Sequence, residues 1–142
     1  SAVLKHHADF EALLVEYRDR MRQHRVQLTR MLMFFSTNAF IYEPTFLWED
    51  EQTIYHRRVY PAALLPKVPE HPANPAGRAL VKELKGRIQE LCSRNGASHM
   101  QAGKDYPYLA SRKPETRALV EDLKRLLDPD RLLNPGALGL PL

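Results

Sequence analysis

The stretch Met31-Leu32-Met33-Phe34-Phe35 is followed by Ser36-Thr37-Asn38 and then by Phe40-Ile41-Tyr42-Glu43-Pro44-Thr45-Phe46-Leu47-Trp48. Both outer segments are rich in aromatic and apolar residues, and the polar residues between them are typical of a turn. The pattern predicts two strands of an antiparallel sheet, joined by that turn. Pro44 has no amide N–H to donate to a neighbouring strand, so we expect the second strand to lie at a sheet edge or to carry a bulge there.

Amphipathic helices are predicted on both sides of these strands. Asp9 can cap a helix whose apolar residues recur at three- and four-residue spacing: Phe10, Leu13, Leu14, Tyr17 and Met21. After the strands, Asn74 and Pro75 supply an N-cap and a proline at the first helical position, and Asn95-Gly96 should end that helix. Gly86 lies inside it at a cost of about 1 kcal/mol relative to alanine, which indicates either close packing or simple tolerance. The predicted apolar face is Leu80, Val81, Leu84, Ile88 and Leu91.

The remaining segments complete an α+β pattern. Five prolines between residues 61 and 76 indicate an irregular connection. We expect a short extended piece at 98–101 and a last helix that begins at Pro114 and stops before Pro129. The expected fold is an antiparallel sheet covered by helices on one face, and the buried side of the last helix would comprise Leu119, Val120, Leu123, Leu126 and Leu127.

Size and charge limit the classes of function. The 142 residues have the length of one ordinary domain, so we expect a single domain over 1–142. The 21 basic and 17 acidic residues are interleaved, which argues against a nucleic-acid surface. Cys92 is the single cysteine, which excludes an internal disulfide. No apolar run is long enough to cross a membrane and no signal peptide is recognisable, so a cytoplasmic location is expected.

The segment from His99 to Tyr108 gathers the side chains best suited to chemistry. His99 can act as a base near neutral pH, because the ordinary pKa of histidine is about 6.5. Lys104 and the phenols of Tyr106 and Tyr108 can hold an anionic substrate. The alternative is structural: His99 satisfies a backbone partner in a strand, and the tyrosines pack with their hydroxyls in water.

A second cluster lies at Tyr55-His56-Arg57-Arg58-Val59-Tyr60. In an extended chain, Arg57 and Arg58 would point to opposite faces, and an inward arginine could take a substrate carboxylate through two parallel hydrogen bonds. Alternatively, both arginines pair with the preceding acids, Glu49, Asp50 and Glu51. Four further histidines show no metal-ligand spacing, and we expect them to be solvated: His6, His7, His24 and His71.

Two C-terminal stretches are Gly96-Ala-Ser-His99-Met-Gln-Ala-Gly103-Lys-Asp-Tyr106-Pro-Tyr108 and Leu127-Asp-Pro-Asp-Arg-Leu-Leu-Asn134-Pro-Gly136. They resemble the FAD-linked oxidase family of flavoproteins, which includes D-lactate dehydrogenase, glycolate oxidase and vanillyl-alcohol oxidase. The resemblance implies a C-terminal, ferredoxin-like cap fragment that covers the substrate, with FAD bound by an N-terminal domain of the same protein. Small 2-hydroxy acids or aromatic alcohols would be oxidised by hydride transfer to the flavin. The fragment alone would be inactive.

The resemblance also implies roles for single residues. His99 matches the histidine near the flavin that accepts the substrate hydroxyl proton, and Asn134 falls where the returning chain nears the cofactor. Tyr106 resembles the tyrosine that stabilises a substrate phenolate, although Pro107 stands where that branch has arginine. Phe40 and Ser98 occupy two metal-ligand positions of the metal-dependent members, so no catalytic metal is expected.

A different class of function is also open. The chain can be a non-catalytic α+β interaction module that associates with itself through an exposed sheet face or edge. A homodimer is compatible with both interpretations, because an isolated cap also exposes an apolar surface.

Overall fold

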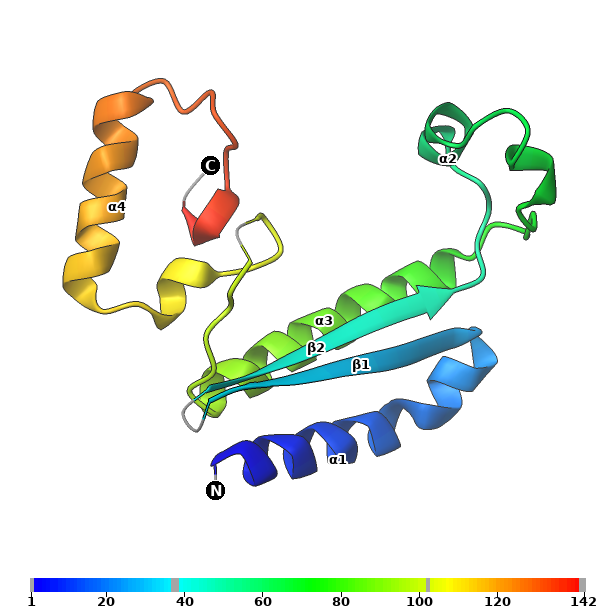
Figure 1. Cartoon of the computed structure of the whole chain (residues 1–142), viewed down its shortest axis with the longest axis horizontal. Helices are drawn as coiled ribbons and strands as arrows, with labels where there is room; N and C mark the ends of the chain where they lie inside the picture. The colour runs from blue at the N-terminus through cyan, green and yellow to red at the C-terminus, as the bar shows by residue number, and fades with distance from the viewer. Residues whose placement is uncertain (1, 37–38, 102, 141–142) are drawn as a thin grey trace. The chain divides into compact units, whose positions relative to one another are not determined.

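The computed structural model describes residues 2–36, 39–101 and 103–140 (Figure 1). Its helices are α1 (Ala2–Gln23), α2 (Ile54–Val59), α3 (Pro75–Arg94) and α4 (Pro114–Leu127), and its strands are β1 (Val26–Phe35) and β2 (Ala39–Trp48). Three short 3-10 turns are η1 (Leu65–Lys67), η2 (Tyr108–Ser111) and η3 (Ala137–Gly139). The chain divides into two compact units, 1–87 and 88–142. The expectation of a single domain over 1–142 stays a prediction.

The two strands form an antiparallel hairpin, as predicted. Their register runs without interruption from Val26↔Trp48 to Phe35↔Ala39. Pro44 lies opposite Arg30 within this ladder, so the strand has no bulge there and Pro44 is accommodated in a strand with a free edge. The first strand begins at Val26 rather than Met31, because apolar and polar residues alternate through 26–30, as in a half-buried strand. The central turn residues 37–38 lie outside the described residues.

The first helix begins at Ala2, so the prediction that Asp9 caps it is wrong. Nothing in residues 2–8 breaks a helix, and Asp9 instead lies inside α1, where it forms an ion pair with Lys5 at 2.5 Å. His6 is buried with Phe10 in the seam between α1 and the hairpin, rather than solvated. Its ring lies 5.4 Å from the ring of Tyr42, centroid to centroid. The buried face of α1 comprises His6, Phe10, Leu13 and Tyr17.

The third helix begins and ends as predicted. The Asn74 side-chain oxygen accepts a 2.8 Å hydrogen bond from the Gly77 N–H, and Gly96 ends the helix in the left-handed region at φ +68°. A Cβ on Gly86 would meet nothing within 4 Å, so this glycine is tolerated and not required by packing.

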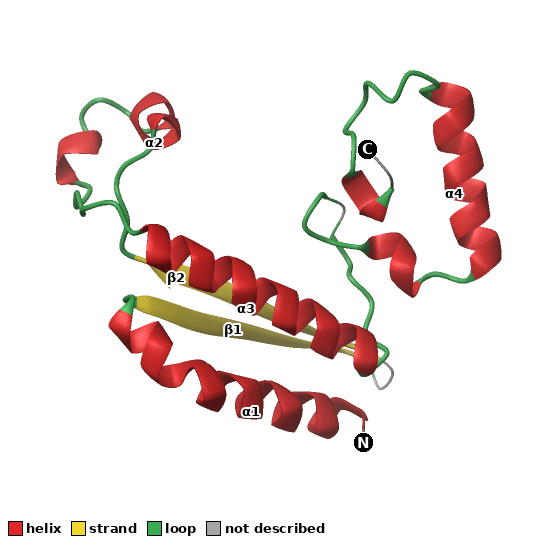
Figure 2. Ribbon diagram, turned by 180° about the vertical axis from the view of Figure 1, so that it is seen from behind, coloured by secondary structure: helices red, strands yellow, loops and turns green. Residues whose placement is uncertain are grey.

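Helices α1 and α3 pack along the hairpin and against each other. Tyr17 and Arg20 of α1 both donate hydrogen bonds of 2.8 Å to Glu83 of α3, which holds the pKa of Glu83 down at about 2. Figure 2 shows both helices running beside the two strands. The fold is thus α+β, with helices packed on a small antiparallel sheet. In unit 1–87 the core includes Phe10, Leu13, Tyr17, Val26, Leu80, Val81 and Leu84.

Two predictions for the second unit are wrong. Residues 98–101 form no strand, because the structure describes no strand beside them with which to form a ladder. Helix α4 has the predicted bounds, but its leucine side is not buried: Leu119 is 59% exposed and Leu126 is 77% exposed. The amphipathic pattern correctly predicted a helix, but within unit 88–142 no described element covers its apolar side.

Candidate functional site

His99 and Tyr106 lie next to each other in unit 88–142. Their ring centroids are 6.0 Å apart, and the rings are tilted by 48°. His99 Nε2 is buried and has no hydrogen-bond partner among the described residues. Burial lowers the pKa of His99 below its ordinary value, so the ring is neutral at pH 7. A neutral imidazole with a free nitrogen is the form that can accept a proton.

Two backbone carbonyls of residues 103–106 accept hydrogen bonds from other parts of the same unit. The Leu138 N–H of η3 donates a 3.1 Å hydrogen bond to the Gly103 carbonyl, and the Gln89 side chain of α3 donates to the Asp105 carbonyl. The Tyr106 ring covers Gly103, where an added Cβ would lie 3.4 Å from it. The turn through residues 103–106 therefore places the Tyr106 ring beside His99 without a regular element. Residue 99 lies in no strand and its Nε2 has no partner among the described residues, which disagrees with the alternative that His99 satisfies a backbone partner in a strand.

The predicted anion-binding residues are arranged differently. Tyr108 begins η2, and its ring lies under Arg112, with the guanidinium carbon 4.6 Å from the ring centroid. Sequence reasoning missed Arg112, whose signal was its position four residues after an aromatic residue in a helical turn. Lys104 is exposed. This unit therefore presents two cationic side chains, Lys104 and Arg112, in the segments that flank Tyr106.

The C-terminal motif is organised by Asp128, which the sequence analysis did not single out. Its carboxylate accepts hydrogen bonds from the N–H groups of Leu132 and Leu133 at 2.9 and 3.0 Å and forms an ion pair with Lys124. The ion pair with Lys124 holds the pKa of Asp128 below its ordinary value. Asn134 is exposed and left-handed at φ 45°. The expectation that Asn134 lies near a cofactor stays a prediction.

The prediction of an extended chain at residues 55–60 is wrong. Residues 55–59 belong to helix α2, and Tyr60 follows it as the C-cap. Thr53 is the N-cap of this helix, and the Thr53 N–H donates a 3.1 Å hydrogen bond to His56 Nδ1. Arg57 and Arg58 are exposed, and Arg57 lies 3.9 Å from Glu70. The expected acidic partners bind other arginines: Glu49 pairs with Arg25, and both Asp50 and Glu51 pair with Arg78. Arg57 and Arg58 belong to unit 1–87, and their expected role in binding a substrate carboxylate stays a prediction.

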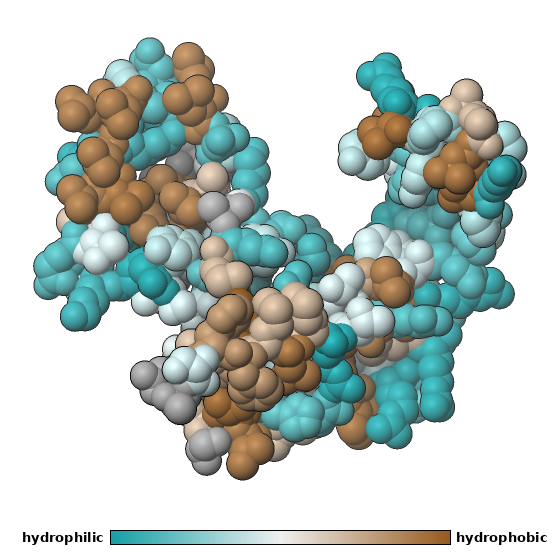
Figure 3. All heavy atoms as spheres, in the orientation of Figure 1, coloured by the Kyte–Doolittle hydropathy of each residue, from teal (hydrophilic) through white to brown (hydrophobic). Residues whose placement is uncertain are grey.

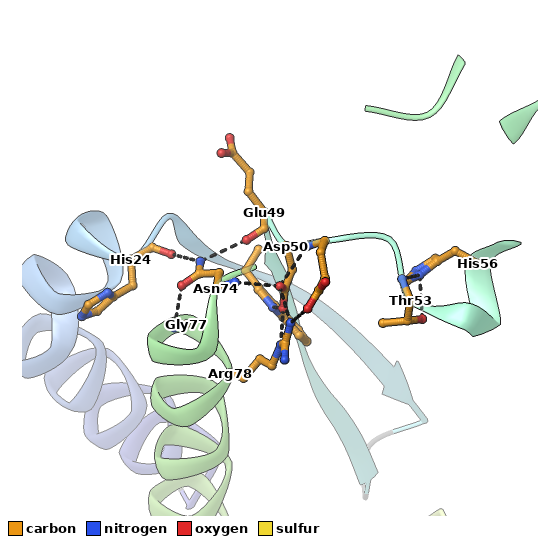
Figure 4. A network of polar contacts seen from close by, with 10 residues as sticks. His24, Glu49, Asp50, Thr53, His56, Asn74, Gly77 and Arg78 are labelled. Carbon is orange, nitrogen blue, oxygen red and sulfur yellow. Dashed lines mark hydrogen bonds and ion pairs between the residues drawn. The ribbon is translucent and has the colours of Figure 1, made fainter. Parts of the chain in front are cut away.

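A polar network centred on Asn74 and Asp50 joins α1, β2 and α3 in unit 1–87 (Figure 4). Asn74 Nδ2 donates to the carbonyls of His24 and Glu49 at 2.9 and 3.0 Å. Asp50 accepts from the Asn74 N–H at 2.8 Å and from two nitrogens of Arg78 at 2.6 and 2.7 Å. These bonds, above all those from Arg78, hold the pKa of Asp50 far below its ordinary value.

A pocket of about 270 Å³ opens beside this network. Its charged side chains bind one another: Glu49 lies 2.5 Å from Arg25 and 3.6 Å from His71. His24 and His71 are half-buried, contrary to the expectation that they are solvated. We therefore interpret this network as a structural connection between the ends of α1, β2 and α3.

Asn74→Ala should lower the free energy of unfolding by about 1–3 kcal/mol, because it removes the helix cap and leaves two carbonyls without their donor. Asn74→Ser keeps an oxygen at the cap and should recover about 1 kcal/mol of that loss. Urea unfolding followed by circular dichroism measures both variants. Equal stability of the alanine variant and the wild type would contradict the role of Asn74.

Stability should fall as the pH drops below about 6.5, the ordinary pKa of histidine. Burial lowers the folded-state pKa of both His6 and His99, so the unfolded chain takes up protons first. The free energy of unfolding that depends on the neutral rings is therefore fully present above pH 6.5. It is lost as the pH falls from 6.5 through the lower pKa values that the two histidines have in the folded chain. Urea midpoints between pH 8 and 5.5 measure this loss, and His7→Gln, at an exposed neighbour of His6, is the control. A midpoint that stays constant over this range would contradict the prediction.

Comparison with protein-family models, with curated proteins and with solved structures finds no match to this chain. Within residues 2–36, 39–101 and 103–140, no helix has both the length and the apolar character needed to cross a membrane. Over the same ranges, no three His, Cys, Asp or Glu side chains gather as a metal site.

Proposed function

We propose that the chain is the substrate-covering C-terminal portion of a cytoplasmic FAD-dependent oxidoreductase that oxidises a small 2-hydroxy acid or an aromatic alcohol. The observation that carries the proposal is the buried, unpartnered Nε2 of His99 beside the ring of Tyr106. A buried polar atom without a partner costs free energy, and such atoms are found where a ligand supplies the missing hydrogen bond. A substrate hydroxyl fits this place, because it can donate to a neutral imidazole.

The residues of unit 88–142 would then hold and deprotonate the substrate. Nε2 of His99 accepts the hydroxyl proton, and the phenol of Tyr106 stabilises the oxygen that loses it. Lys104 and Arg112 supply positive charge for a substrate carboxylate. FAD, bound by a separate domain, supplies the acceptor for the hydride, so the 142-residue chain by itself is inactive.

Purification of the complete protein encoded around this sequence tests the proposal. We expect a yellow protein whose flavin absorbance bleaches without oxygen when the right 2-hydroxy acid or aromatic alcohol is added. The 142-residue chain, prepared in the same way, should be colourless and inactive. A complete protein that holds no flavin, and that gains none on incubation with FAD, would refute the proposal.

The second candidate is a non-catalytic interaction module. It is favoured by the exposure of apolar side chains on the hairpin, which Figure 3 shows gathered at the end of the strands nearest the turn. Met31, Met33 and Phe35 are 44%, 37% and 50% exposed. Only the oxidoreductase predicts bound flavin, so the same purification separates the two candidates.

A further inference from the structure

The sequence of strand β1 is typical of a strand that is buried on both faces, but its apolar side chains at residues 31–35 are exposed. Met31, Leu32, Met33, Phe34 and Phe35 are consecutive, so their side chains alternate between the two faces of the hairpin. All five are exposed, including Leu32 at 43% and Phe34 at 70%. A continuous apolar run of this kind is typical of a strand in the interior of a sheet.

Strand β2 is better covered than β1. Phe40, Ile41, Tyr42, Glu43 and Pro44 are all half-buried, whereas residues 29–36 are all exposed. The difference arises because α1 contacts β2 through its aromatic residues: the ring of Phe10 lies 4.7 Å from that of Tyr42, and the ring of His6 lies 6.2 Å from that of Phe40. The apolar side chains at residues 31–35 of β1 are therefore less covered than those at residues 40–44 of β2.

The edge of β1 can also accept another strand. Its ten residues contain no proline, so none of them lacks an N–H, whereas β2 contains Pro44. Its single charged residue is Arg30, and an ion pair with Glu11 of α1 neutralises it. In most proteins, charged side chains, prolines or bulges prevent an edge strand from pairing with another chain. Strand β1 has no proline and no bulge, and its one charge is neutralised by an ion pair. A two-stranded hairpin also gains stability from further strands.

We propose that two copies of this chain join along β1 to form a continuous four-stranded antiparallel sheet with its helices on one face. The proposal gives the interaction-module candidate a specific surface and partner, and it uses only residues of unit 1–87. A register centred on Met31 places each Met31 against its twin and each Thr29 against Met33 of the second copy. It also pairs Arg30 with Leu32 of that copy, so the two arginines are not opposite each other.

Charge favours pairing by the edge over stacking by the face. Glu43 is the one charged residue on the face opposite the helices, and it lies in β2 opposite Met31. Two stacked faces would bring the Glu43 residues together. Edge pairing separates them by three strand spacings, about 14 Å, which exceeds the screening length of about 8 Å at physiological salt.

The mass of the 142-residue chain in solution tests the proposal, together with two matched variants. Wild type should sediment at twice 16.4 kDa, with a monomer appearing on dilution. Met31→Lys places two ammonium groups at the twofold axis and should weaken the dimer by about tenfold or more. Ile41→Lys makes the same kind of change on the same face, but in β2 and away from the axis, and should change the dissociation constant by less than about threefold.

Four results would overturn the proposal. Two concern the wild type: a monomer at all concentrations, or association without a defined dimer. Two concern the variants: an unchanged dimer in Met31→Lys, or equal weakening by both lysine variants. Equal weakening would indicate that the two copies stack by their sheet faces. Circular dichroism must show that both variants fold. If Met31→Lys does not fold, amide hydrogen exchange of the wild type tests the pairing instead. The amides of β1 should exchange more slowly as the protein concentration rises. Exchange rates that are the same at all concentrations would refute the pairing. Flavin content of the complete protein is measured separately, so failure of the flavin proposal leaves this test intact.

Discussion

Replacing Phe10 with alanine should lower the free energy of unfolding by about 3–5 kcal/mol. The Phe10 ring is fully buried, lies 4.7 Å from the Tyr42 ring and connects α1 with the hairpin. Its removal loses the transfer free energy of the side chain and leaves a cavity that the surrounding residues fill only in part. Total stabilities of natural domains are about 5–15 kcal/mol, so this single change should bring the first unit close to unfolding.

A matched control is Val15→Ala in the same helix. Val15 is 57% exposed, so its truncation should change stability by less than about 0.5 kcal/mol. Urea unfolding, followed by far-ultraviolet circular dichroism and by tyrosine fluorescence, measures both variants. A loss below about 1 kcal/mol for Phe10→Ala would mean that α1 is not anchored to the hairpin through this ring.

Replacing His99 with alanine in the complete, flavin-containing protein should lower kcat by about 10²- to 10⁴-fold, the usual contribution of a general base. The pH profile provides a second readout. A base must be neutral to accept a proton, so the wild-type kcat/KM should rise with pH through the pKa of His99, which lies below its ordinary value. His99→Ala should lose this acidic limb, whereas a purely structural role would leave its position unchanged.

Tyr106→Phe is the matched control for this variant. It retains the ring that lies 6.0 Å from the His99 ring and removes only the phenol. If the phenol stabilises the substrate oxygen, kcat should fall while the acidic limb of the pH profile remains. Unchanged turnover in His99→Ala, with flavin still bound and the denaturation midpoint preserved, would remove His99 from the mechanism.

Capping residues, glycine and proline correctly predicted the ends of those helices that neighbouring residues determine. The N-cap at Asn74 and the left-handed glycine at 96 bound α3 because both act through hydrogen bonds or backbone angles of neighbouring residues. Similarly, Pro114 begins α4. The start of α1 was missed because Asp9 matches the cap pattern, although residues 2–8 continue the helix without interruption.

Helix α2 and the site show where local reasoning reaches its limit. The sequence of residues 55–60 is compatible with an extended chain, whereas Thr53 and His56 together favour a helical turn. In the site, neighbouring positions in the sequence suggested one cluster from His99 to Tyr108. The structure brings His99 and Tyr106 together but engages Tyr108 with Arg112. Such pairings depend on the path of an irregular chain through Gly103, which no periodicity encodes.

Short-range patterns were enough to predict the α+β class, the hairpin and the ends of α3 and α4, because alternation, caps and turn residues act over a few positions. Which apolar residues are buried became known from the folded chain alone. Phe10, whose ring lies beside that of Tyr42, and Leu84 are fully buried, whereas the leucines of α4 and the apolar run of β1 remain exposed. Burial depends on what lies opposite a side chain in space. Apolar patterns of similar strength are therefore buried in α1 and α3 but exposed in α4 and β1.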